Sequence, residues 1–198
     1  MTLPGLPVII KQVMYKIMQL HPDCERILMS SREIGEVTKS LADRLNRDYA
    51  GKTVYMICIL KGASVFYSDL VRLLTFDVRF DFMCVSSYGS ATASSGEVCI
   101  RKDLDSSVKD ADVIIVEDIV DSGLTMNYLV NYLAARSPRS INICALMDKP
   151  SRRKTPVEVR YSGMEIPDAY VVGYGLDYAE KYRNLPYIAV LRPEIYGG

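Results

Sequence analysis

The segment Val113–Thr125 constrains the fold of this 198-residue chain more strongly than any other part of the sequence. It opens with four β-branched apolar residues, Val113–Val116, a pattern typical of a strand that is buried on both faces. Acidic residues follow closely, at Glu117, Asp118 and Asp121. A turn of small residues and the start of a helical pattern complete the segment. A buried strand, an acidic end, a tight turn and a helix in this order predict a unit of an α/β fold.

The turn at Ser122-Gly123 and the helical pattern that begins at Leu124 predict a binding site for a phosphorylated sugar. The backbone N–H groups of such a turn, together with the positive end of the helix, can hold a phosphate group. The hydroxyls of Ser122 and Thr125 add further donors, and the carboxylates before the turn can accept hydrogen bonds from ribose hydroxyls. The plainer alternative is that Asp121 or Ser122 simply caps the helix.

Alternating strand and helix patterns extend over most of the chain and predict a parallel β-sheet core flanked by helices, an α/β fold. Helices are expected at residues 31–49, 62–74 and 124–136, the first of them behind a capping box formed by Ser30 and Glu33. Strands are expected at 53–60, 78–87, 97–102, 113–118 and 141–147, and near 157–161, 169–174 and 187–191. The first 28 residues are expected to form an arm with little structure of its own.

Three distant segments that carry polar residues stand at the carboxyl ends of predicted strands. They are Leu60-Lys61-Gly62, Glu117-Asp118 and Asp148-Lys149. Ligand sites in open α/β sheets lie at this edge of the sheet. The topology therefore predicts that the three segments meet around one site.

The charge pattern argues against a nucleic-acid partner and against a membrane span. Lys and Arg total 24, and Asp and Glu total 24, so the net charge is zero, whereas nucleic-acid binders usually carry a basic excess. The short basic cluster Arg152-Arg153-Lys154 is interpreted as part of a solvated loop at 149–156. Lys11 and Lys16 interrupt the apolar stretch near the N-terminus, so no run is long enough to cross a bilayer.

The cysteine and histidine content limits the compartment and the chemistry. The five cysteines are odd in number and widely spaced without a C-x-x-C motif, which indicates reduced thiols and a cytoplasmic protein. His21 is the single histidine and stands near the N-terminus. A His-rich metal site is therefore excluded, and a mechanism based on a Ser-His-Asp or Cys-His arrangement is disfavoured.

The segment around Asp121 resembles the signature of the type I phosphoribosyltransferases, the loop that binds 5-phosphoribosyl-1-pyrophosphate. Further motifs occur in the order found in the hypoxanthine-guanine branch of that family. These motifs are Leu60-Lys61-Gly62, Ser87-Tyr88, Asp148-Lys149, Tyr170-Val171-Val172-Gly173-Tyr174 and Leu176-Asp177-Tyr178 with Arg183. The resemblance extends from about Ser30 to Val190.

The resemblance implies a single domain with a core at about 30–160 and a small hood built from about 1–29 and 161–198. It implies an enzyme of purine salvage that transfers the 5-phosphoribosyl group to N9 of hypoxanthine or guanine, with xanthine as a further candidate, and releases pyrophosphate. It also implies Mg²⁺ as the cofactor, small-molecule substrates and a homodimer or homotetramer.

Roles for individual residues follow from the same resemblance. Asp121 matches the proposed general base. Residues that match contacts to the sugar phosphate and pyrophosphate are Lys61, Gly62, Glu117, Asp118, Asp121, Ser122, Gly123, Leu124, Thr125 and Arg183. Lys149, Tyr170, Val171 and Asp177 match contacts to the purine, and Asp177, Glu117 and Asp118 match the metal contacts. Ser87 and Tyr88 match the start of a mobile loop. Leu124 stands where some members have Lys, and Tyr170 stands where many have Phe.

Three alternatives stay open at this level. A non-enzymatic regulator can share this fold and loop while sensing nucleotides. A phosphoribosyltransferase can also act on another base, such as adenine or a pyrimidine. The third alternative is a nucleotide-binding α/β protein of another type, which is disfavoured because the chain lacks a G-x-G-x-x-G motif and a P-loop.

Overall fold

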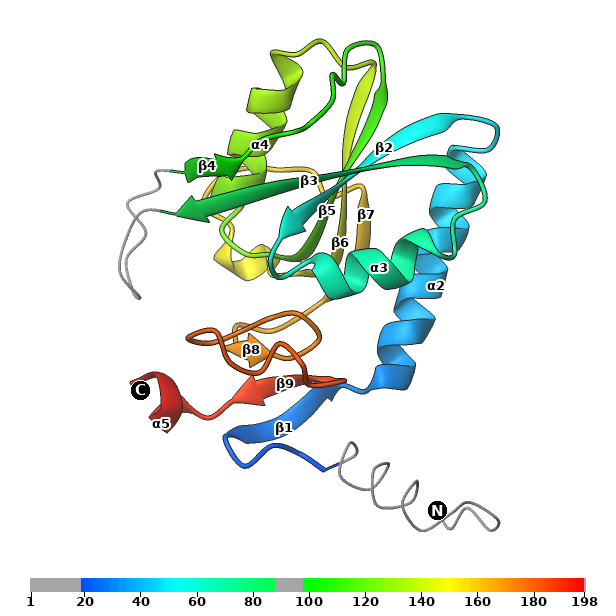
Figure 1. The fold of residues 1–198 in the computed structure, drawn as a ribbon. Coiled ribbons are helices and arrows are strands. Elements are labelled where there is room, and N and C mark those ends of the chain that lie inside the picture. Colours follow the sequence, from blue (N-terminus) through cyan, green and yellow to red (C-terminus); the bar gives the residue numbers. More distant parts are fainter. Residues whose placement is uncertain (1–18, 88–97, 198) are drawn as a thin grey trace, which may run out of the picture.

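The computed structural model describes residues 19–87 and 98–197, which form two β-sheets with flanking helices (Figure 1). The strands are β1 (Cys24–Met29), β2 (Thr53–Leu60), β3 (Asp77–Ser87), β4 (Val98–Lys102), β5 (Asp112–Val120), β6 (Ser140–Asp148), β7 (Tyr161–Glu165), β8 (Val171–Val172) and β9 (Ile188–Leu191). The helices are α2 (Ser31–Asp48), α3 (Ser64–Val71), α4 (Leu124–Ala134), α5 (Pro193–Tyr196) and the 3₁₀ turn η1 (Pro150–Arg152).

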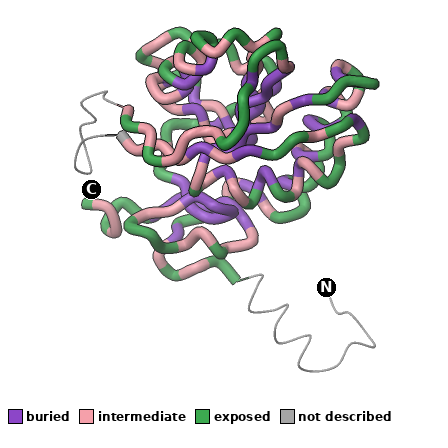
Figure 2. Tube along the Cα trace, turned by 45° about the horizontal axis from the view of Figure 1, so that its top comes forward, coloured by how far each residue is buried: buried purple, intermediate pink, exposed green. Residues whose placement is uncertain are grey.

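The large sheet has the strand order β4-β3-β2-β5-β6-β7, and its strands are parallel except for β4, which runs antiparallel to β3. This arrangement confirms the predicted α/β class. Residues of β2 alternate between two cores, as expected for a central strand that is covered on both faces. Met56 and Cys58 pack in the core that includes α2 and α3, whereas Ile57 and Ile59 pack in the core that includes α4. The buried residues accordingly gather along the middle of the sheet (Figure 2).

A local sequence signal sets the start of α2. The side chain of Glu33 accepts a hydrogen bond from the N–H of Ser30 at 2.8 Å, and the hydroxyl of Ser30 accepts one from the N–H of Glu33 at 3.4 Å. The capping box predicted at the start of α2 is therefore confirmed.

Strand β5 continues to Val120, two residues beyond the predicted end, because it stays paired with β6 as far as Asp148.

The small sheet joins the two ends of the described chain in the order β1-β9-β8. Strand β1 falls in the segment that was expected to have little structure, so that expectation is wrong for residues 24–28. Its pairing partner β9 lies more than 150 residues later, and no local pattern reports such a contact. Figure 1 places the small sheet beside the large one, with α5 at its edge.

The strand expected near 157–161 is found four residues later, as β7. Val157 and Val159 alternate like a strand but pack from a loop against the core that includes α4. Strand β7 pairs with β6 in the large sheet. Residues 161–165 therefore belong to the core, although they were expected to belong to the hood. Among the described residues, no helix combines the length and apolar character needed to cross a bilayer.

Candidate active site

The carboxyl ends of β2, β5 and β6 lie side by side, because these three strands are parallel neighbours in the large sheet. They bring together Leu60 of β2, Glu117 and Asp118 of β5, and Asp148 of β6, as the topology predicted. Two cavities open at this edge. One lies over the turn between β5 and α4, and the other lies between this edge and the small sheet.

The first cavity, of about 240 Å³, lies over the turn that links β5 to α4 and has the features of a phosphate cradle. Its lining includes Gly62, Glu117, Asp121, Ser122, Gly123 and Thr125. Gly123 precedes α4 with a φ of +81°, a left-handed conformation that favours glycine. A Cβ atom at this position would lie 2.5 Å from the carbonyl oxygen of Thr155, so the turn also needs a residue without a side chain. Leu124 begins α4, and its N–H donates to the hydroxyl of Ser122 at 3.4 Å.

Glu117 and Asp118 form an acidic pair beside this cavity. Asp118 is buried, and the Oε2 atom of Glu117 is buried without a hydrogen-bond partner among the described residues. Burial and the neighbouring charge of Asp118 raise the pKa of Glu117 well above its usual range. Burial also raises the pKa of Asp118, against the opposing positive charge of Arg183. A Cβ atom on Gly62 would lie 1.9 Å from an Asp118 oxygen, so the Lys61-Gly62 turn approaches this pair closely. Hydroxyl donors from a ligand would satisfy the unpaired oxygen.

Replacing Glu117 with Gln should stabilise the unliganded protein at pH 8 by roughly 1 kcal/mol, because Glu117 is ionised in the unfolded chain at this pH whereas the folded protein disfavours its charge, and an amide avoids this cost. The folded protein holds the Glu117 proton more tightly than the unfolded chain does. The associated stability is therefore fully present below pH ~4 and is lost as the pH rises toward the folded pKa. Urea unfolding of the parent and of Glu117→Gln at pH 8 and near pH 4 measures this difference in the free energy of unfolding, with Glu36→Gln on α2 as the control. A gain of equal size at both pH values would contradict the assignment.

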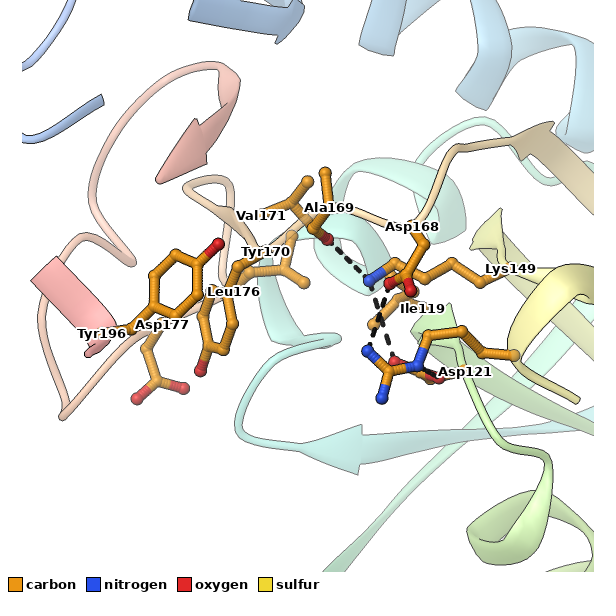
Figure 3. A pocket seen from close by; sticks show the side chains of 11 residues that line it. Ile119, Asp121, Lys149, Asp168, Ala169, Tyr170, Val171, Leu176, Asp177 and Tyr196 are labelled. Atoms are coloured by element: carbon orange, nitrogen blue, oxygen red, sulfur yellow. Dashed lines mark hydrogen bonds and ion pairs between the residues drawn. The ribbon is translucent and has the colours of Figure 1, made fainter. Parts of the chain in front are cut away.

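The second cavity, of about 530 Å³, lies between the large sheet and the small one, and its walls suit a flat heterocycle (Figure 3). Lys149 lies in it with its ammonium group buried, donating to the carbonyl oxygen of Ala169 at 2.7 Å. Burial lowers the pKa of Lys149, and the Asp121 carboxylate opposes that shift. Tyr170 presents a ring to the cavity and stacks on Tyr196, with 4.9 Å between the ring centroids. Val171 and Leu176, which are buried, and Asp177, which is partly exposed, complete this side.

Asp121 is shared by the two cavities, as is Ile119. The Asp121 carboxylate faces two cations, with one oxygen 3.1 Å from Nε of Arg152 and the other 3.7 Å from Nζ of Lys149. Arg153 donates to the backbone carbonyl oxygen of Asp121 at 2.9 Å. A group bound in one cavity would therefore meet a group bound in the other beside this carboxylate.

Cations gather next to the Lys61-Gly62 turn. The Leu60–Lys61 peptide bond is cis. The ammonium group of Lys61 lies 2.9 Å from the Glu180 carboxylate, and the hydrogen bond from Lys61 lowers the pKa of Glu180. Arg183 pairs with Asp177 at 2.7 Å and donates to the carbonyl oxygen of Gly175 at 2.7 Å, while its Nε atom has no partner among the described residues. This arrangement could receive a polyphosphate.

The sequence analysis did not predict three residues that line the second cavity. One predicted site residue lies outside the part of the chain that the structure describes. Arg152, Asp168 and Tyr196 line the second cavity although none was predicted there. The basic cluster at 152–154 was interpreted as part of a solvated loop, and Arg152 is indeed exposed. It also bridges Asp121 and Asp168, with each contact at 3.1 Å. Ser87 ends β3, and Tyr88 lies outside the described residues.

Comparison with known proteins agrees with this geometry. Residues 27–179 match the family described as the phosphoribosyl transferase domain. The chain is 51% identical over 174 residues to the hypoxanthine-guanine phosphoribosyltransferase of Bacillus subtilis (strain 168), covering 88% of this chain and 97% of the relative.

Two solved structures are similar over nearly their whole length. A hypoxanthine phosphoribosyltransferase from Staphylococcus aureus aligns with a TM-score of 0.85 at 45% identity, covering 94% of this chain and 98% of that one. The Trypanosoma cruzi hypoxanthine phosphoribosyl transferase, from work on the role of its C-terminal region on oligomeric state and enzymatic activity, aligns with a TM-score of 0.85 at 40% identity, covering 90% and 96%. This chain therefore belongs to the phosphoribosyltransferase family, in its hypoxanthine-guanine branch.

Proposed function

We propose that the protein transfers the phosphoribosyl group of 5-phosphoribosyl-1-pyrophosphate to N9 of hypoxanthine or guanine, giving the nucleoside monophosphate and pyrophosphate. Xanthine is a further candidate substrate. The observation that carries this proposal is the junction at Asp121, where a cavity with a phosphate cradle meets a cavity suited to a planar base. Transfer between two bound substrates requires such a junction, because the reacting atoms must come within about 3–3.5 Å of each other.

The residues divide the chemistry between them. The turn at Ser122–Thr125 binds the 5-phosphate, and Glu117 and Asp118 accept hydrogen bonds from the ribose hydroxyls. As the C1–oxygen bond to pyrophosphate breaks, the bond from C1 to the base nitrogen forms, and Asp121 takes or shares the proton that the base loses. Asp121 lies close enough to Lys149, at 3.7 Å, for the two side chains to face the same base. Enclosure between the two sheets limits the access of water to the ribose cation.

Recognition of a 6-oxopurine depends on Lys149 and Tyr170. An ammonium group is a donor without acceptor capacity, so it favours the carbonyl oxygen at C6 over the amino group of adenine. The hydrogen bond from Nζ to Ala169 fixes the direction of the side chain. Tyr170 supplies the stacking face, and Val171 supplies backbone groups for the edge of the base.

Magnesium fits this site as a partner of the substrate's phosphates. Among the described residues no group of three or more His, Cys, Asp or Glu side chains could hold a metal by itself. Mg²⁺ usually binds through one or two carboxylates together with substrate phosphates, and the Glu117–Asp118 pair with its unpaired oxygen and Asp177 could supply these. When bound, the ion would neutralise charge on the leaving pyrophosphate.

We further propose that the protein acts as a homodimer or homotetramer in the cytoplasm. The two sheets would work as one catalytic unit, because residues of both line the base cavity. All five cysteines are free, which suits a reducing compartment.

Pyrophosphate release with a panel of bases tests the proposed function. The protein should turn over hypoxanthine and guanine and prefer hypoxanthine to adenine by at least ~100-fold, since a buried charged donor left unpaired is costly. Lys149→Ala should reduce that preference by about tenfold, the order expected for the loss of a hydrogen bond from a charged group. Lys109→Ala, which removes an exposed lysine, serves as the control. Unchanged selectivity in Lys149→Ala would discard its role, and turnover with adenine or a pyrimidine alone would discard the proposed substrate class.

A further inference from the structure

Glu180 contacts two cations beside the Lys61-Gly62 turn, the ammonium group of Lys61 and the guanidinium group of Arg183. Its carboxylate lies 2.9 Å from Nζ of Lys61 and 3.5 Å from a terminal nitrogen of Arg183. Lys61 belongs to the turn after β2, whereas Glu180 and Arg183 belong to the segment between β8 and β9. The carboxylate thus ties together the two sides of the site.

The backbone around Glu180 is held in an uncommon conformation. Ala179, Glu180 and Tyr182 have φ values of +50°, +63° and +75°, a region that residues other than glycine adopt at some cost. The N–H of Glu180 donates to a carboxylate oxygen of Asp177 at 2.9 Å. Asp177 also binds Arg183, so one acid fixes both the turn and the guanidinium group. The turn therefore directs the Glu180 carboxylate toward the cations.

We propose that Glu180 is an internal counter-ion that competes with pyrophosphate for Lys61 and Arg183. This inference rests on the proposed function and concerns the regulation of the same site. A carboxylate and a phosphate oxygen are alternative partners for the same ammonium and guanidinium donors. Pyrophosphate must displace Glu180 to bind, and Glu180 returns to its cations when pyrophosphate leaves. The side chain thereby weakens pyrophosphate binding and assists the release of this product.

The solvent exposure of the ion pair sets how strongly Glu180 can weaken pyrophosphate binding. The side chains of Lys61 and Glu180 are 63% and 65% exposed, and such pairs are weak in water. Removing the negative charge of Glu180 should therefore tighten the binding of pyrophosphate by about threefold rather than by orders of magnitude. Added salt should shrink the difference, because exposed charges are screened.

The test is a calorimetric titration of pyrophosphate with Mg²⁺ into the parent protein, Glu180→Gln and Glu36→Gln. Glu36 is an exposed glutamate of α2 whose ion-pair partner, Arg32, lies on the same helix, so its replacement makes the same change in net charge. Glu180→Gln should lower the dissociation constant for pyrophosphate about threefold, while Glu36→Gln leaves it unchanged. An unchanged or weaker affinity in Glu180→Gln would overturn the inference.

A second comparison tests whether the contact with Lys61 contributes to the effect of Glu180 on pyrophosphate affinity. In a Lys61→Met background the gain from Glu180→Gln should shrink, because one of its two cations is absent. An equal gain in both backgrounds would overturn the assigned contact. Formation of nucleotide by the parent separates this test from the proposed function. If the parent makes nucleotide and binds pyrophosphate but Glu180→Gln binds it no more tightly, the inference about Glu180 fails alone. If the parent does neither, the proposed function fails with it.

Discussion

Asp121→Asn should lower kcat for nucleotide formation by about 10²–10⁴-fold, the range associated with loss of a general acid or base. An amide of nearly the same shape keeps the turn intact but cannot take a proton from the base. The backbone carbonyl of Asp121, which accepts from Arg153, is unaffected by the change. The KM for 5-phosphoribosyl-1-pyrophosphate should stay within about threefold, since the substitution leaves the backbone N–H groups of residues 122–125, which are proposed to hold the phosphate, unchanged. Steady-state kinetics with both substrates varied separates these two effects.

Asp43→Asn is a matched control for this experiment. Asp43 is an exposed carboxylate on α2 that pairs with Lys39 of the same helix, so its loss changes the net charge equally. It should leave kcat unchanged. Parental turnover in Asp121→Asn would remove the general-base assignment, and a large rise in KM with an intact kcat would make Asp121 a binding group instead.

Gly123→Ala should lower kcat/KM for 5-phosphoribosyl-1-pyrophosphate by about 100-fold, because displacement of a binding group by about 1 Å can cost that much. The new Cβ atom would lie 2.5 Å from the backbone oxygen of Thr155, which cannot move without shifting the segment behind the turn. That segment donates from the N–H groups of Lys154 and Thr155 to the carbonyl oxygen of Ser122. The turn must therefore shift, and its N–H groups lose their alignment on the phosphate.

Gly51→Ala separates this crowding from backbone strain. Gly51 has a φ of +71°, similar to that of Gly123, but no atom lies within 4 Å of the Cβ position. Its replacement should cost about 1 kcal/mol of folding stability and leave the kinetics unchanged. Denaturant unfolding and kinetics on both variants make the comparison. If Gly123→Ala loses no more activity than Gly51→Ala, the turn does not need the close approach described here.

The parts of the site that the sequence predicted are those with a local cause. Continuous apolar runs locate the central strands, and the parallel order of β2, β5 and β6 then brings their carboxyl ends together. The turn around Gly123 could be located because strand, acids, small residues and helix follow one another without interruption. The specific roles of its residues came from the resemblance to a family and stay predictions until activity is measured.

The parts that were missed depend on contacts between distant residues. Strand β1 exists because it pairs with β9. Tyr196 reaches the second cavity, between the two sheets, because α5 follows β9. Arg152 is exposed as expected, but the sequence did not show that Asp121 and Asp168 hold it in the wall of the cavity. Glu180 carried no signal of its own, since its partner Lys61 lies 119 positions away in the sequence. Such pairings become visible when the chain is folded.

Amide hydrogen exchange on addition of 5-phosphoribosyl-1-pyrophosphate and Mg²⁺ tests most directly whether the turn between β5 and α4 grips the phosphorylated sugar. The N–H groups of residues 122–125 should become strongly protected, while amides at the far end of α2 change little. Addition of hypoxanthine alone should not protect them. Unchanged exchange across this turn at saturating substrate would contradict the account.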